Sequence, residues 1–107
     1  MGYQVVASTA TESLSEKAWL DLIALAALHG SAAPRLGNLV RDAATYLTEE
    51  EAAGLHAALE RVLTVVVLQE HITTEHDVLD RDTVRRVSHV LRQPGLKMIR
   101  RTPPWWR

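Results

Sequence analysis

The sequence predicts an all-α fold: a four-helix bundle-like single domain with an extended N-terminal arm and an extended basic C-terminal tail. Residues 48–73 combine a helix-capping sequence with apolar residues at helical spacing, which indicates one long helix. Similar apolar spacing occurs in three further segments, at about 13–29, 35–47 and 80–92. The 107 residues are enough for one modest core, so residues 1–107 are expected to form a single domain.

The composition excludes several classes of protein. The chain contains no Cys, which rules out disulfides, thiolate nucleophiles and Cys-based metal sites. Its longest apolar run, Trp19 to Leu28, is interrupted at Asp21 and is too short to span a bilayer. The first residues lack a basic stretch followed by an apolar one, so no signal peptide is evident. We therefore expect a cytoplasmic protein that does not contact a membrane.

The first predicted helix, 13–29, has apolar residues around most of its surface. Residues 1–11 before it are expected to form a short strand or a flexible arm, and Ser13 with Glu16 resembles a capping box. Beyond an inner face of Leu and Ala, the helix also carries Trp19 and Ile23. Either this helix is central, or another chain covers its outer face. We predict the second arrangement, a homodimer or higher oligomer, or a protein partner in place of the second copy.

The second and third predicted helices follow closely on one another. Pro34 suits the first turn of a helix at 35–47. Thr48 and Glu51 form a capping box for the helix at 49–73. One face of that helix is apolar, with Ala52, Leu55, Leu59, Val62, Leu63 and Val66. An alternative is that Val62 to Leu68, which is rich in β-branched residues, forms a buried strand.

The last predicted helix, 80–92, is capped by Asp80 and ends before Gln93-Pro94-Gly95. Its inward residues are Val84, Val87 and Leu91. In the tail, 94–107, Leu96 to Arg101 is expected to form a short strand, and one possible neighbour is the N-terminal arm. The Pro-Pro pair after it favours an extended end.

Charge is distributed unevenly along the chain. Residues 1–80 contain four Lys or Arg against twelve Asp or Glu, whereas residues 81–107 contain eight against one. Arg81, Arg85 and Arg92 fall within about 40° on a helical wheel, and Arg100 and Arg101 extend this basic region. We expect this basic region to do one of two things. It binds an anionic partner, for example a phosphate backbone, or it docks on acidic residues of its own subunit or of a neighbouring subunit.

Two other groups of residues carry possible chemistry. The segment from Glu70 to Asp80 concentrates acids and histidines, but the spacing of His71 and His76 matches no zinc signature, so we predict no metal site. Ser88 and His89 are sequence neighbours and face different directions on a helix, so no catalytic residues are predicted. No glycine-rich phosphate loop is present, and no cofactor is expected.

The function predicted from these patterns is that of a non-enzymatic helical protein-interaction module, namely an adaptor, inhibitor or regulatory subunit. Trp and Arg are enriched at interface hot spots, which draws attention to the tail. The predicted partner-binding residues are Trp19, Ile23, Arg81, Arg85, Arg92, Arg100, Arg101, Trp105, Trp106 and Arg107. The alternative is a nucleic-acid-binding regulator that uses helix 80–92 and the tail. A metal-dependent enzyme is a distant third possibility.

Overall fold

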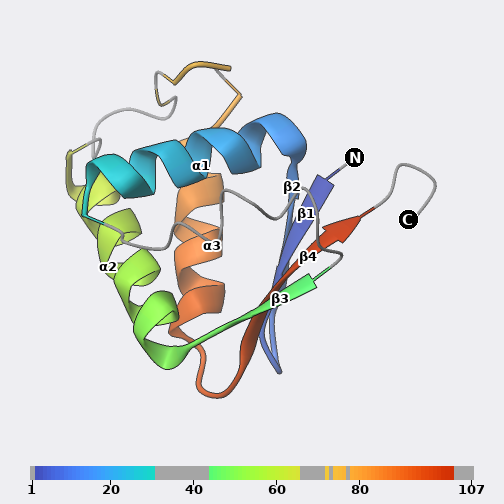
Figure 1. Ribbon diagram of the computed structural model, residues 1–107. Coiled ribbons are helices and arrows are strands. Elements are labelled where there is room, and N and C mark those ends of the chain that lie inside the picture. The colour runs from blue at the N-terminus through green and yellow to red at the C-terminus, as the bar shows by residue number, and fades with distance from the viewer. Residues whose placement is uncertain (1, 31–43, 66–71, 73, 77, 103–107) are drawn as a thin grey trace.

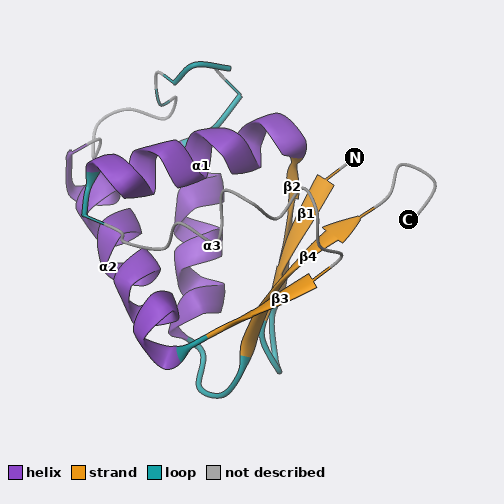
Figure 2. Cartoon of the chain, in the orientation of Figure 1, coloured by secondary structure: helices purple, strands orange, loops and turns teal. Residues whose placement is uncertain are grey.

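The all-α prediction is wrong, because the chain folds as an antiparallel sheet with helices on one side (Figure 1). The computed structural model describes residues 2–30, 44–65, 72, 74–76 and 78–102. Within these residues, the elements in chain order are β1 (Gly2–Val6), β2 (Thr11–Ser15), α1 (Glu16–Leu28), β3 (Ala44–Leu47), α2 (Glu49–Val65), α3 (Arg81–Arg92) and β4 (Lys97–Thr102). Figure 2 shows the helices as one layer and the strands as the other.

The sheet joins the two ends of the described chain. Its strand order is β2-β1-β4-β3, and every neighbouring pair is antiparallel. The strand that the sequence allowed at 96–101 corresponds to β4, and the neighbour that it allowed, the N-terminal arm, forms β1. A Cβ atom at Gly2 would lie only 2.6 Å from the Leu14 carbonyl oxygen, which is too close. Glycine therefore suits this position of the β1–β2 pair.

The predicted helix at 13–29 begins later than expected. Residues 11–15 pair with β1 as strand β2, so Ser13 lies in the sheet and does not cap a helix. Ser15 takes the capping role instead, and its Oγ accepts a hydrogen bond of 3.2 Å from the backbone N–H of Ala18. The helix α1 therefore starts directly where the strand ends.

The predicted helix at 35–47 is wrong over residues 44–47, which form β3, while 35–43 lie outside the described residues. The Thr48–Glu51 capping box is confirmed. Thr48 Oγ1 accepts the Glu51 N–H at 3.0 Å, and Glu51 Oε1 accepts the Thr48 N–H at 2.9 Å. From this cap α2 runs to Val65, so the strand alternative is wrong for residues 62–65. Residues 66–71 are outside the described range, and Ile72 is not helical.

The helix predicted at 80–92 is confirmed as α3, and its Asp80 cap accepts the Thr83 N–H at 2.7 Å. Val84, Val87 and Leu91 are buried, as the spacing predicted. The bundle itself is wrong because the core lies between the helices and the sheet, and strands β1 and β4 contribute Tyr3, Val5 and Ile99 to it.

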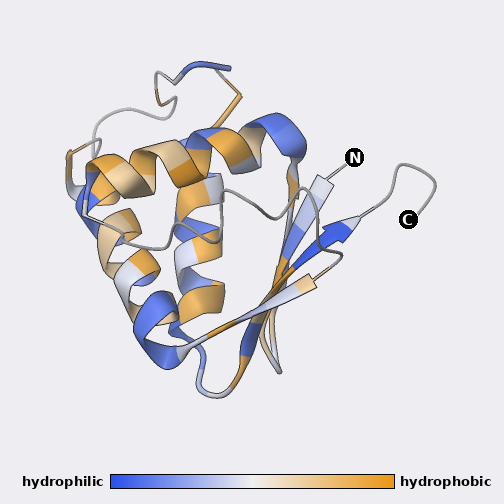
Figure 3. Cartoon of the chain, in the orientation of Figure 1, coloured by the Kyte–Doolittle hydropathy of each residue, from blue (hydrophilic) through white to orange (hydrophobic). Residues whose placement is uncertain are grey.

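The apolar character of α1 has an explanation within a single chain. The helix contacts β1, β2 and α2, so several of its sides are covered, and Figure 3 shows it as hydrophobic along most of its length. Trp19 is only 1% exposed and stacks on Tyr3 with ring centroids 5.3 Å apart. Ile23 is partly buried against the same core. The side of α1 that faces the core is therefore covered within one chain, whereas Leu20 and Leu28 are 41% and 81% exposed, so the predicted oligomer stays a prediction.

Candidate functional site

The strands present one face to the helices and one face away from them. Because side chains alternate along a strand and cross-strand partners share a face, the register assigns each residue to a side. Val5 pairs with Ile99, and both are fully buried on the helix side. Their neighbours in β1 and β4, Val6 and Met98, pair with each other on the opposite side. In Figure 1 the described helices α1, α2 and α3 lie on the first side.

We call the second side the open face. The residues that the register places on it are Gly2, Gln4, Val6, Thr11, Ser13, Ser15, Ala44, Tyr46, Met98, Arg100 and Thr102. Val6, Met98 and Tyr46 form one cross-strand row of apolar side chains on β1, β4 and β3. Tyr46 is 63% exposed, which is unusual for a large side chain within a sheet. This row is the most apolar part of the open face.

A second row of the open face is polar and tied together by hydrogen bonds. Gln4 Nε2 donates to Ser13 Oγ at 3.2 Å, and Arg100 Nε donates to Gln4 Oε1 at the same distance. Gln4 therefore orients the Arg100 guanidinium beside the apolar row. Sequence reasoning selected Arg100 but missed Tyr46 and Met98, since only the register shows that these three share a face.

The composition of the open face resembles that of a protein interface. Tyr, Met and Arg are enriched in such interfaces, whereas Lys, Glu and Asp are depleted from them. Tyr46, Met98 and Arg100 are all present on the open face, and its eleven described positions include no Lys, Glu or Asp. The acid of β2, Glu12, belongs to the helix side. This makes the open face the candidate docking site.

The structure separates the basic residues that the sequence grouped together. In β4, Arg100 lies on the open face and Arg101 on the helix side, because they are consecutive in a strand. On α3, Arg85 pairs with Asp82 at 2.9 Å. Neighbouring Arg86 pairs with Asp82 and, at 3.0 Å, with Glu12. Ion pairs within the subunit therefore neutralise some of the basic residues in the C-terminal part of the sequence.

The other predicted partner-binding residues have different environments. Arg81 has a buried Nε with no hydrogen-bond partner in the part of the chain that the structure describes. Arg92 is exposed at the end of α3 and borders a groove. Trp105, Trp106 and Arg107 lie outside the described residues. Trp19 is buried in the core, so its assignment as a partner contact is wrong.

A buried polar cluster joins α1 to the connection between α2 and α3. Asp21 is 2% exposed and accepts hydrogen bonds from Thr74 Oγ1 at 2.5 Å and from the His76 backbone N–H at 3.2 Å. The His76 Nδ1 lies 2.8 Å from the same carboxylate. Burial raises the pKa of Asp21, but hydrogen bonds from Thr74 and His76 outweigh it, so the pKa lies below its ordinary value.

This cluster orients an imidazole and also anchors a loop. A carboxylate bound to Nδ1 leaves Nε2 as the acceptor, an arrangement found in acid–base dyads. Among the described residues no nucleophile is paired with it, and Ser88 Oγ, instead of meeting His89, donates to Glu60 at 2.7 Å. Among the residues described, no three His, Asp or Glu side chains gather as metal ligands, and Glu70, His71 and Asp77 lie outside that range. The sequence signal for this cluster was a single Asp within an apolar helix.

No family model matches the sequence, and neither a curated protein nor a solved structure matches it. None of the described helices combines the length and the apolar character that crossing a bilayer requires. The geometry of the surface is therefore the guide to function.

Proposed function

We propose that this chain is a non-enzymatic protein-interaction module, acting as an adaptor, inhibitor or regulatory subunit, and that it docks onto a protein partner through the open face. The observation that supports this most strongly is the row of Val6, Met98 and Tyr46 beside Arg100. Aromatic and Arg side chains are the common anchors of interfaces, and apolar neighbours exclude water around them.

The size of the open face indicates the strength of this docking. Four strands spaced about 4.8 Å apart, with about five residues each at 3.3 Å, give a footprint of roughly 300 Å². A standard stable interface buries about 800 Å² on each partner. The open face alone therefore supports transient, reversible docking, and a tighter complex needs contacts beyond it.

A protein partner is favoured over nucleic acid by the distribution of charge. Phosphate-backbone binding needs several available cations along one surface. The open face carries only Arg100, while Arg85 and Arg86 pair with acids of the same chain. Binding to nucleic acid through α3 and the basic end remains the second candidate, and Tyr46 is the residue on which a base would stack.

The test places a photo-crosslinking amino acid at Tyr46 in the full chain, which is expressed in the source cells. We expect the protein to act in the cytoplasm of these cells. The matched control places it at Leu28, which is 81% exposed near the end of α1 and away from the sheet. Irradiation should join the Tyr46 variant to one discrete protein partner, identified by mass spectrometry. The Leu28 variant should give little of that adduct.

Several outcomes would overturn the proposal. Equal amounts of adduct from both positions would show that the partner does not bind preferentially at the open face. An adduct that disappears on nuclease treatment would favour the nucleic-acid candidate. An adduct between two copies of this chain would replace the partner with a homo-oligomer, and sedimentation equilibrium would measure its strength.

A further inference from the structure

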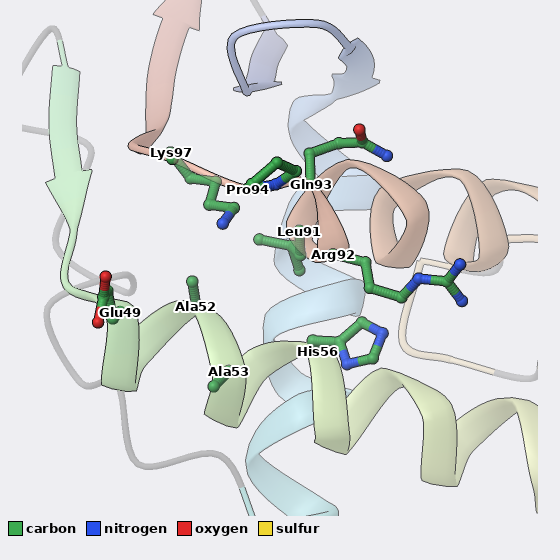
Figure 4. A pocket seen from close by; sticks show the side chains of 10 residues that line it. Glu49, Ala52, Ala53, His56, Leu91, Arg92, Gln93, Pro94 and Lys97 are labelled. Atoms are coloured by element: carbon green, nitrogen blue, oxygen red, sulfur yellow. The ribbon is translucent and has the colours of Figure 1, made fainter.

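A groove separate from the open face lies between the first half of α2 and the connection from α3 to β4 (Figure 4). Its volume is about 440 Å³, which falls within the range of small-molecule sites. The buried side chains of Ala52 and Leu91 contribute to its lining. Charged side chains lie around them, with Glu49 from α2, Arg92 from α3 and Lys97 from β4.

The two cations of the groove, Arg92 and Lys97, differ from Arg85 and Arg86 of α3. Arg85 and Arg86 are paired with acids. The side chains of Arg92 and Lys97 form no ion pair or hydrogen bond with any residue in the described ranges. Figure 4 shows the Lys97 ammonium extending into the space between α2 and the turn after α3. Two cations from different elements thus border the same hollow, and neither forms a salt bridge with a side chain in the described ranges.

The hollow exists because the side chains next to these cations are small. Ala52 and the exposed Ala53 stand where longer side chains would fill the space. The opposite wall is the Pro94-Gly95 turn, and the positive φ of Gly95, 91°, lets the chain reverse sharply into β4. Shape and charge therefore combine at one place.

We propose that this groove binds a small organic anion through a carboxylate or phosphate group, with Arg92 and Lys97 as the counter-charges. Glu49 lies in the same lining, so the charges around the groove are two cations and one carboxylate, and a singly charged ligand suits it better than a polyanion. The small alanines and Leu91 accommodate a short apolar part of the ligand. This site is independent of the docking surface, since its lining residues are not on the open face.

The test is an amide NMR titration of the full chain with two probes, sodium acetate and inorganic phosphate, at constant ionic strength maintained with sodium chloride. Saturable shifts should appear at the amides of Ala53 and Gly95, with millimolar dissociation constants typical of such small probes. Comparison of the two probes identifies which anionic group the groove prefers. If neither probe gives saturable shifts there beyond those of chloride, the proposal is wrong.

Charge variants distinguish binding of the anion at this groove from its attraction to surface charge in general. Lys97→Gln should weaken binding of the preferred probe about fivefold, the size expected for one solvent-exposed ion pair. Arg85→Gln, which removes a more exposed cation that is paired with Asp82, should leave the affinity unchanged. Glu49→Gln should tighten binding by removing the opposing charge. An equal loss in the Lys97 and Arg85 variants would overturn the proposal.

The contribution of the groove's shape is tested with variants that leave the charge unchanged. Ala53→Leu should fill the groove and abolish the saturable shifts, while Ala27→Leu makes the same change at an exposed position of α1 outside the groove. Both positions are helical and both residues are good helix formers, so the fold should persist in each variant. Unaltered binding in Ala53→Leu would show that the anion does not occupy this groove.

Discussion

Replacing Asp21 with Asn should destabilise the fold in a pH-dependent way. The substitution keeps the volume of the side chain but removes the charge that accepts hydrogen bonds from Thr74 and His76. Hydrogen bonds to a charged group contribute about 1.5–3 kcal/mol each, and Asn retains part of them, so we expect a loss of about 2–3 kcal/mol at neutral pH. At roughly 4 °C per kcal/mol this lowers Tm by roughly 8–12 °C.

The direction of the pH dependence follows from the lowered pKa of Asp21. A carboxyl whose folded pKa is below its unfolded value of about 3.9 stabilises the fold above that pH. The stabilisation is lost as the pH falls through the folded pKa. The stability difference between wild type and Asp21→Asn should therefore be full at pH 7 and should shrink in acid below about pH 4.

Urea denaturation at several pH values measures both effects. The matched control is Asp82→Asn, since Asp82 pairs with Arg85 and Arg86 but is 53% exposed. A surface pair of this kind contributes about 0–1 kcal/mol. An Asp21→Asn variant as stable as the control at pH 7, or with a stability deficit that does not change with pH, would contradict this role of the buried carboxylate.

Further predictions concern a core residue, a turn, a helix cap and the binding of duplex DNA. Trp19→Ala should cost about 3–5 kcal/mol in chemical denaturation, because the ring is buried against Tyr3; a loss below about 1 kcal/mol would contradict the core position. Gly95→Ala should cost about 1–2 kcal/mol, because φ is 91° there, and an unchanged urea midpoint would argue against this turn. Thr48→Ala should cost about 1 kcal/mol through loss of the capping box, detectable as a lower Tm. Duplex DNA binding should be negligible in a gel-shift assay at about 0.15 M salt, whereas a log–log salt slope of about −3 to −4.5 would support the nucleic-acid alternative.

The features that the sequence predicted correctly depend on local signals. The capping box of α2 needs only Thr48 and Glu51, and α3 combines the Asp80 cap with apolar residues at helical spacing. Each of these interactions forms between residues three or four positions apart. The β4 strand was also recognised, because residues 94–95 end the helix before it.

The fold class was missed because β2 and β3 are short edge strands with weak patterns. In β2 only Leu14 is buried, and Ser13 with Glu16 imitates the start of a helix. In β3 the residues Ala44–Leu47 fit the end of a helical stripe equally well. β2 pairs with its neighbour β1, but β3 with β4 and β1 with β4 pair over long stretches of sequence, and apolar spacing does not reveal such contacts.

The candidate site was only partly predictable for the same reason. Arg100 was selected from charge alone, and it does lie on the open face. Tyr46 was placed inside the expected helix 35–47, and Met98 drew no attention. Their approach to one another is set by the pairing of β3 with β4. Trp19 was selected for its size in an apolar helix, and that signal describes a core residue equally well.

The central claim, that the open face is the docking surface, is tested most directly by measuring the affinity of the purified Tyr46-crosslinked partner for Met98→Glu. This change places a carboxylate in the middle strand pair of the open face, beside Val6 and Tyr46. Leu28→Glu makes the same apolar-to-acid change at an exposed helical position. We predict at least about tenfold weaker binding for Met98→Glu, equivalent to about 1.4 kcal/mol, and no change for Leu28→Glu. Unchanged affinity in a folded Met98→Glu variant would contradict the claim.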